Sequence, residues 1–171
     1  MKTHALTYVF DGWDGYARSI AEAIRPLTPD QLDFSGDEEM RTVGELAWHI
    51  AHGRVDWFGR MGVAGCSELA VEMEAMETPE EAVDLVEWLD RTWRIVQSTL
   101  EGWTVDDLAE TYRQPYQDKV YAVSRQWVVW RVMTHDVHHG GQLSELLALQ
   151  GILPLELTLL GGHLTVPPLA E

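Results

Sequence analysis

Four stretches of the chain repeat apolar residues every three or four positions, which is the spacing of a helix with one buried face. They cover about residues 6–27, 42–61, 82–102 and 124–151. In the third stretch the apolar face consists of Ala82, Leu85, Val86, Leu89, Trp93, Val96 and Leu100. The pattern therefore predicts four long helices, and no stretch of the chain gives a convincing sheet.

Helix-start signals mark where several of these helices begin. Thr28-Pro29-Asp30-Gln31 and Thr42-Val43-Gly44-Glu45 are capping boxes, in which a Thr and a Gln or Glu three residues later bond each other's backbone N–H. The first predicts a short helix, and the second opens the second long helix. Thr78-Pro79-Glu80-Glu81 has the same form and predicts the start of the third helix. Ser124 can cap the fourth, which Gly151 ends.

The connections between the helices are polar or irregular in pattern. We expect a loop over 35–40, an irregular acidic segment over 63–77 and a short capped turn over 104–108. Residues 110–122 contain a proline and three tyrosines and predict a long loop or a short hairpin, which could serve as a lid over a pocket.

Together these elements predict one all-α domain over residues 1–171, a four-helix bundle. Its first and third connections are long enough to allow crossovers between the helices. The apolar tail, residues 152–171, is expected to pack on the bundle or on the partner of a homodimer.

Composition excludes several classes of function. The chain has 171 residues and 46% hydrophobic residues, enough for a real core, and carries a net charge of −16. This charge argues against nucleic acid and anionic membranes as partners, because both require clustered Lys and Arg. Cys66 is the single cysteine, so no internal disulfide is possible. With no apolar run of membrane-spanning length and no signal peptide at the N-terminus, we expect a cytoplasmic protein.

His135 and His139 are the strongest candidates for chemistry. They lie four residues apart in the fourth predicted helix, which places both imidazoles on one face, one turn apart. That face is mostly apolar, so both rings are expected to point inward. His138 lies about 100° round the helix on a more polar face, and we leave it outside the metal ligands.

A third ligand is expected from the second helix, which offers His49 and His52. We favour His49, because its stripe borders the apolar one and Gly53 follows it by one turn, where a glycine lets another group approach closely. Three neutral imidazoles favour zinc or nickel, with iron, manganese and copper as alternatives, and leave a coordination position open. Four polar residues could orient the ligands or a bound water: Asp136, Gln142, Asp56 and Glu45.

Each of these observations also has a purely structural interpretation. A pair of histidines four apart is often incidental, and an inward histidine is usually a hydrogen-bonded core residue. Cys66 reads as a buried free thiol rather than a nucleophile. The combination of His49 with His135 and His139, on two helices of one bundle, is what favours a metal site.

Two segments resemble the DinB/YfiT-like superfamily of metal-binding four-helix bundles, which is unrelated to the DNA polymerase of similar name. Residues 43–51 are similar to the family's first-histidine helix, and 135–143 resemble its His-[Asp/Glu]-x-x-His-Arg-Gly-Gln signature. The resemblance covers nearly the whole chain and implies the metal ligands His49, His135 and His139. Gly140 departs from the pattern, because the family usually has Arg there, and so a contact made by that Arg is in doubt.

The resemblance also implies a class of function. Family members with known activities include metal-dependent transferases and isomerases that use small thiols such as bacillithiol, mycothiol or glutathione, and dimers are common. We therefore expect a thiol S-transferase acting on small electrophiles, with Gln142 or Asp56 orienting the thiol or a water. Arg125 and Arg131 are the basic residues near the motif that could hold an acidic thiol. A metal-dependent hydrolase and a non-catalytic, stress-associated metal-binding bundle remain alternatives.

Overall fold

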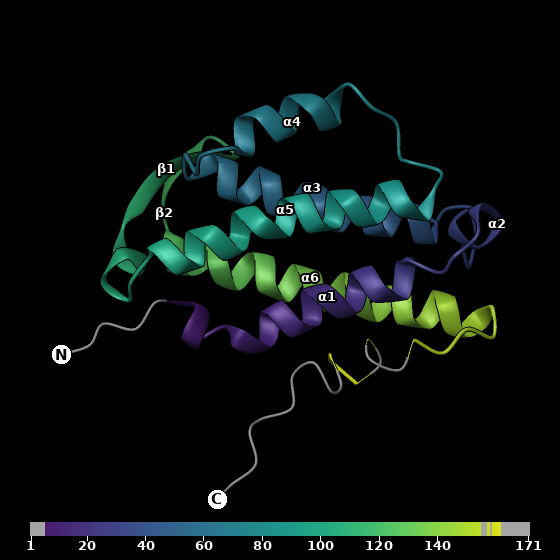
Figure 1. Ribbon diagram of the computed structural model, residues 1–171. Helices are drawn as coiled ribbons and strands as arrows, with labels where there is room; N and C mark the ends of the chain where they lie inside the picture. Colours follow the sequence, from purple (N-terminus) through teal and green to yellow (C-terminus); the bar gives the residue numbers. More distant parts are fainter. Residues whose placement is uncertain (1–5, 155–156, 158, 162–171) are drawn as a thin grey trace, which may run out of the picture.

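Four long helices lie side by side in the computed structural model, which describes residues 6–154, 157 and 159–161 (Figure 1). They are α1 (Asp11–Ile24), α3 (Val43–Arg60), α5 (Ala82–Gly102) and α6 (Arg125–Leu149). A 3₁₀ turn, η1 (Leu6–Tyr8), precedes α1, so the first helix starts later than its apolar pattern predicts. None of the helices in the described part of the chain is both long and apolar enough to cross a membrane.

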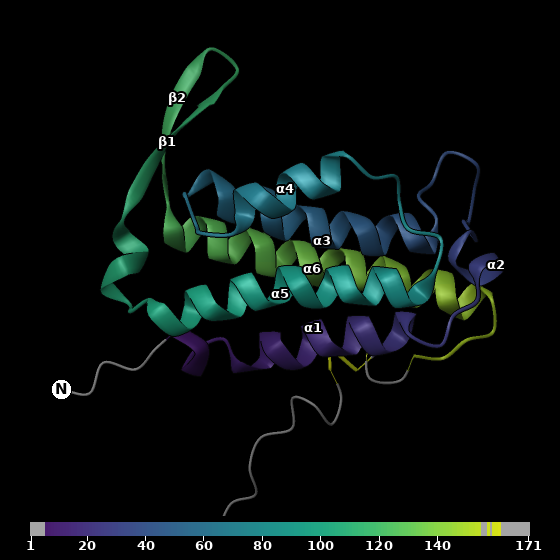
Figure 2. The same cartoon turned by 45° about the horizontal axis from the view of Figure 1, so that its top comes forward.

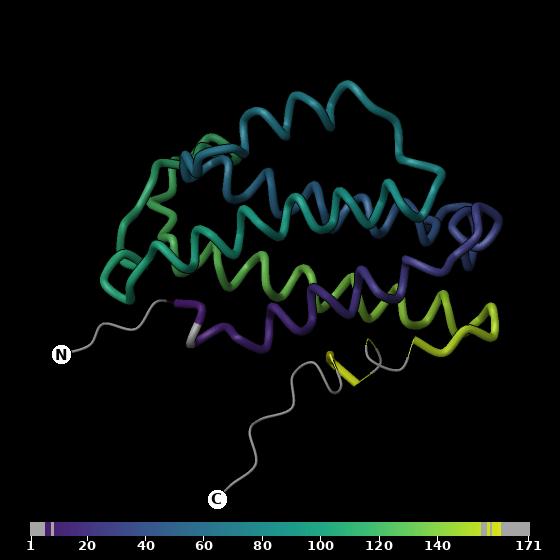
Figure 3. Tube along the Cα trace, viewed as in Figure 1, coloured from purple at the N-terminus to yellow at the C-terminus, as the bar shows by residue number. Residues whose placement is uncertain are grey.

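The packing of the four long helices does not simply follow their order in the chain. Helix α3 packs against α5 and α6, and α1 packs against the same two helices from the other side. Helices α3 and α5 run in the same direction, while α1 and α6 run the opposite way (Figures 1 and 2). The chain therefore crosses over between α3 and α5, along a path that Figure 3 traces over the outside of α3. We expected the first and third connections to be long enough for crossovers, and the structure has a crossover in the second.

That crossover carries a helix that the sequence pattern did not predict. Helix α4 (Cys66–Glu74) lies within the segment we expected to be irregular, and it packs against α3. It buries only Cys66, Leu69 and Met73, which have helical spacing. Our prediction of an irregular segment was wrong because the surrounding acidic residues hid this narrow apolar stripe.

The helix-start signals were correct in three of four places. Thr28 forms a capping box with Gln31 and opens α2 (Pro29–Leu32), and Thr42 forms one with Glu45 at the start of α3. Ser124 accepts a hydrogen bond from the Trp127 N–H at the start of α6. The signal at 78–81 was wrong, because α5 begins at Ala82, where its apolar face first meets the core, without a side-chain cap.

The expectation of an all-α chain fails at residues 111–124. Strands β1 (Thr111–Tyr116) and β2 (Lys119–Ser124) form an antiparallel hairpin after the 3₁₀ turn η2 (Asp106–Ala109). Gln117 and Asp118 both have positive φ, at 45° and 60°, as a two-residue hairpin turn requires. The turn contains no glycine, and so the strongest sequence signal for it was missing. The hairpin projects from the end of the helices, as Figure 2 shows.

The tail prediction lies mostly outside the described residues. Of residues 152–171, the structure describes 152–154, 157 and 159–161, and Leu157 is buried in the core. The remaining core consists of the inward faces of the helices and is predominantly apolar.

Candidate metal centre

Three histidines from α3 and α6 meet at one point. The ring centroids of His49 and His135 are 4.8 Å apart, those of His49 and His139 are 4.6 Å apart, and those of His135 and His139 are 4.4 Å apart. One ligand atom of each lies within 4.8 Å of the others, so these three side chains could hold a metal ion. They are the three residues that the sequence pattern selected.

The antiparallel packing of α3 on α6 brings the histidines together. Helical spacing places His135 and His139 one turn apart, and Gly53, one turn after His49, lies opposite His135. A Cβ on Gly53 would lie 2.5 Å from Cε1 of His135. Gly53 is therefore required for α3 to approach this imidazole, as its place in the sequence suggested.

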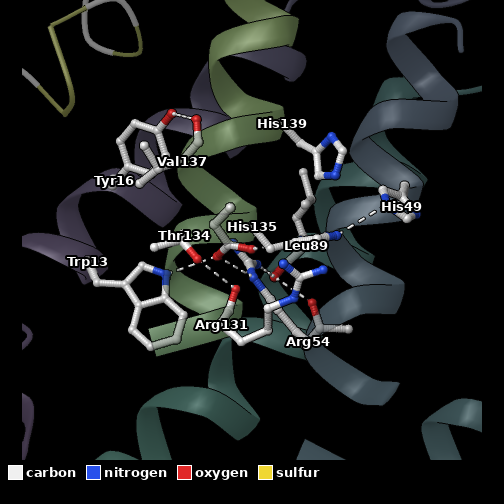
Figure 4. A network of polar contacts seen from close by, with 12 residues as sticks. Trp13, Tyr16, His49, Arg54, Leu89, Arg131, Thr134, His135, Val137 and His139 are labelled. Carbon is white, nitrogen blue, oxygen red and sulfur yellow. Dashed lines mark hydrogen bonds and ion pairs between the residues drawn. The ribbon is translucent and has the colours of Figure 1, made fainter. Parts of the chain in front are cut away.

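The separation of two ring nitrogens fits a shared ion. Nε2 of His135 and Nε2 of His49 are 3.1 Å apart, and a dashed line joins the two residues in Figure 4. Two nitrogens bound to one tetrahedral zinc at 2.0–2.1 Å lie about 3.3–3.4 Å apart. The observed spacing therefore matches a chelate with a small adjustment of the rings.

Gln142 holds the third imidazole from behind. Its Oε1 lies 2.6 Å from Nδ1 of His139, one turn along α6. An amide oxygen only accepts, so the proton lies on Nδ1 and the Nε2 lone pair is left for a metal. This is the orienting contact anticipated for Gln142.

Asp136 lies behind His135. Its Oδ1 is 4.0 Å from Nδ1 of His135, and both atoms are buried without a hydrogen-bond partner among the described residues. The carboxylate favours the tautomer with the proton on Nδ1, because a lone pair there would face a negative charge. That tautomer directs the Nε2 lone pair of His135 toward His49.

The other oxygen of Asp136 is held by groups that the sequence analysis missed. Oδ2 accepts hydrogen bonds from Trp13 Nε1 at 2.9 Å and from Arg54 Nε at 3.0 Å. Arg54 also donates to the backbone carbonyl of Leu89 at 3.1 Å, and both members of the ion pair are almost fully buried (Figure 4). The pair therefore joins all four long helices directly behind the histidines. Arg54 falls in line with Ile50 and Phe58 at helical spacing, and a charge inside an apolar stripe was the signal that could have found it.

Two of the proposed orienting residues are engaged elsewhere. The carboxylate of Glu45 accepts from the Thr42 backbone N–H at 2.8 Å in its capping box. Asp56 binds Arg60 one turn along α3, with contacts of 3.1 and 2.8 Å. Each has a local partner that competes with the histidines, and among the described residues Asp56 forms no hydrogen bond or ion pair with the three histidines.

Burial favours the neutral imidazoles of His49 and His139. Burial lowers the pKa of His49 to about 4, and the positive charge of Arg41 and the neighbouring imidazoles act in the same direction. Burial also lowers the pKa of His139, against the opposing effect of its hydrogen bond to Gln142. Burial alone would raise the pKa of the Asp136 carboxyl, but Arg54 and the hydrogen bonds to it hold that pKa below its usual range. Neutral imidazoles are the form that binds metals.

The glycine that departs from the family signature has a steric role here. The hydroxyl of Tyr16 lies against Gly140, in the space that a Cβ would occupy, and donates to the carbonyl of Val137 at 3.3 Å. Gly140 therefore admits Tyr16 from α1, and no larger residue fits there without displacing it.

One side of the centre opens into a small pocket. His49 lines a cavity of about 230 Å³ together with Arg41, Glu45, Trp48, His52 and Thr78. A ligand on the open side would thus meet one basic and one acidic side chain, Arg41 and Glu45.

His138 lies outside the three-histidine cluster. It is exposed on α6 and contacts the edge of His139, with ring centroids 4.8 Å apart.

The fold and the cluster define a mostly helical protein with a three-histidine site that could hold a metal. The DinB family model matches residues 1–165, and the chain belongs to the DinB family. A DinB-like protein from Bacillus cereus ATCC 10987 has a similar structure, with a TM-score of 0.66 over 83% of this chain and 90% of that chain. At 20% identity this likeness shows the fold alone. A search of curated proteins gives no match.

Proposed function

We propose that this DinB-family protein is a cytoplasmic four-helix-bundle metalloprotein, in which His49, His135 and His139 bind one divalent ion, zinc or nickel. The observation that supports this most is the convergence of three imidazoles, with Gln142 beside His139 and Asp136 beside His135. Iron and manganese are compatible with the same donors. The opening beside His49 leaves room for an exogenous ligand, as in catalytic rather than closed structural sites.

The activity we propose is metal-dependent transfer of a low-molecular-weight thiol to a small electrophile. A divalent ion held by three imidazoles supplies the Lewis acidity that lowers the pKa of a ligated thiol. Gln142 and Asp136 fix the imidazole orientations, and the buried Arg54 holds Asp136 in place. Arg41, at the opening, carries the positive charge suited to an acidic thiol. Arg125 is committed elsewhere, to Glu110 at 2.7 Å.

A metal-dependent hydrolase is the second candidate, and Glu45 is the observation that favours it. Its carboxylate lines the same cavity as His49, where a general base for a metal-bound water would be required. Its hydrogen bond to the Thr42 N–H occupies one oxygen and holds the carboxylate at the start of α3. This contact makes the transferase the better supported of the two.

Metal analysis of matched variants tests the metal site. His139→Ala should abolish stoichiometric zinc or nickel in protein purified without chelator. His138→Ala removes an exposed imidazole from the next position and should retain the metal. Full metal occupancy in His139→Ala would overturn the site.

An assay of the metal-loaded protein with a panel of small thiols and electrophiles tests the reaction. We expect thiol consumption that is lost with His139→Ala and retained with His138→Ala. Turnover that needs no thiol and is lost with Glu45→Gln would instead establish the hydrolase. A metal-loaded protein with neither activity would establish the non-catalytic bundle.

A further inference from the structure

A second and larger cavity lies between the hairpin and the adjoining ends of α3 and α6. Its volume is about 850 Å³, within the range of small-molecule sites. Its walls are largely aromatic, and its lining residues include Trp57, Arg60, Tyr116, Tyr121, Trp127 and Arg131. None of the residues that hold the candidate metal lines it.

This cavity and the metal centre lie along the same pair of packed helices, α3 and α6. In the antiparallel pairing of α3 with α6, Gly53 lies against His135, and Trp57 lies against Trp127 with ring centroids 5.3 Å apart. Arg131 precedes His135 by one turn, which is about 6 Å along the axis, and Trp127 precedes it by about 12 Å. The two residues of α6 that line the cavity therefore lie about one and about two helix turns from the nearest histidine.

The charge of the cavity is opposite to that of the protein. The chain has a net charge of −16, yet the cavity is lined by two arginines and no acidic residue. Arg60 is neutralised by Asp56 and lies over the ring of Trp57, 4.5 Å from its centroid. Arg131 is exposed, and none of the ion pairs among the described residues includes it. It is therefore the free positive charge of the cavity.

The aromatic walls favour a flat ligand. The rings of Trp57 and Trp127 meet edge to face at 62°, and Tyr116 and Tyr121 remain 60% and 46% exposed on the hairpin. Exposed aromatic side chains gathered around one hollow offer stacking surfaces to a planar apolar group. The guanidinium of Arg131 presents a planar pair of donors that matches a carboxylate.

We propose that this cavity binds a small organic anion with a flat apolar body, its carboxylate held by Arg131 and its body between Trp57, Trp127 and the hairpin tyrosines. That this molecule is the substrate of the metal centre rests on the proposed function. The binding itself does not, because no metal ligand contributes to the cavity.

Calorimetric titration with 2-naphthoate and its neutral analogue 2-naphthamide tests the proposal on the full chain. Arg131→Gln should weaken 2-naphthoate about tenfold, as expected for loss of a charged hydrogen bond, and should leave 2-naphthamide unchanged within about twofold. Arg113→Gln is the matched control. Arg113 is an exposed arginine on the hairpin beside the cavity, and it does not line the cavity. Equal effects of the two substitutions would overturn the role of Arg131.

A second pair of variants tests the aromatic wall. Trp127→Leu should weaken both ligands, whereas Trp130→Leu should weaken neither, because Trp130 is 49% exposed on α6 but does not line the cavity. Absence of saturable 2-naphthoate binding to the wild type would overturn the proposal. Light scattering tests the alternative that this face is an interface between two copies. If Trp127→Leu changes a dimer to a monomer and the protein does not bind naphthoate, the proposal is overturned as well.

Titration of His139→Ala separates this proposal from the proposed function. If the variant loses metal and still binds 2-naphthoate, both proposals stand. If the wild type binds 2-naphthoate and holds no metal, the cavity stands and the metal site fails. If the wild type holds metal and does not bind 2-naphthoate, the cavity proposal fails alone.

Discussion

Two polar clusters lie back to back between α3 and α6. Consecutive residues of α6, His135 and Asp136, belong to one cluster each. His135 belongs to the histidine cluster, whose ring nitrogens face one another and open toward a pocket. Asp136 belongs to the buried cluster with Arg54 and Trp13, where donors and acceptors meet inside the core. The first gathers lone pairs that could bind a cation, and the second contains a cation of its own, the guanidinium of Arg54.

This difference separates a binding site from a structural one. A buried carboxylate is tolerated when an arginine and further hydrogen bonds compensate it, as they do at Asp136. The three imidazoles converge with one another, and a metal ion is the ligand that could engage all three together. The two clusters meet where Oδ1 of Asp136 lies behind Nδ1 of His135, so the buried ion pair also orients that imidazole.

The largest expected effect is on the buried pair. Asp136→Asn removes the charge that compensates Arg54 and should lower the free energy of unfolding by about 3–5 kcal/mol in chemical denaturation. The exposed pair between Glu72 and Arg91 is the control, and Glu72→Gln should cost less than about 1 kcal/mol. Similar costs for the two substitutions would remove the distinction between the clusters.

Acid titration sharpens the same prediction. The pKa of the Asp136 carboxyl in the folded protein is lower than its usual value. The stabilisation it gives is therefore present above the unfolded pKa of about 3.9 and is lost as the pH falls through the lower folded pKa. Asp136→Asn should therefore remove this loss of stability in acid. If the free energy of unfolding of the variant depends on pH as that of the wild type does, the prediction is wrong.

Metal should stabilise the histidine cluster alone. Zinc at 100 times its dissociation constant should raise the free energy of unfolding of the wild type by about 2.7 kcal/mol. Chelation should reverse this gain in stability, and zinc should not stabilise His139→Ala. Without metal, His139→Ala should lie closer to the wild type in its free energy of unfolding than Asp136→Asn does. An equal gain in both proteins would place the bound zinc elsewhere.

The close approach of the helices gives a third way to test the comparison. Gly53→Ala would displace the ring of His135 and should weaken zinc binding at least tenfold, because the added Cβ has no room. Gly141→Ala on α6 has open space around its Cβ and should leave the affinity unchanged while stabilising the helix by about 1 kcal/mol. Zinc titrations of the two variants with a competing chelator would measure this difference.

The smallest effect should come from the residue that orients His139. Gln142→Ala frees the Nδ1 of that imidazole and should weaken zinc about tenfold without a large change in fold stability. Glu145→Ala, an exposed position one turn away, is the control. If Gln142→Ala retains the wild-type affinity, the 2.6 Å contact has no orienting role.

Local patterns predicted the parts of this protein whose causes are local. Capping at Thr42 and Ser124 follows from residues within one turn, and so does the common face of His135 and His139. Helix α4 was missed because a narrow apolar stripe gives a weak local signal, and the hairpin stayed an alternative to a long loop because its turn contains no glycine. Glu45 and Asp56 each bond a partner within one turn, Thr42 and Arg60, and their role beside the histidines stays a prediction.

The sequence by itself determined the four long helices, the pairing of His135 with His139 and the choice of His49 as the residue that could join them. Only the tertiary structure decided that α3 runs antiparallel to α6 at the register that puts Gly53 against His135 and Arg54 against Asp136. Helical periodicity fixes which side chains share a face, because it depends on the backbone geometry of one segment. The partner across that face, 82 or 86 residues away, depends on how whole faces pack, and no single segment encodes it.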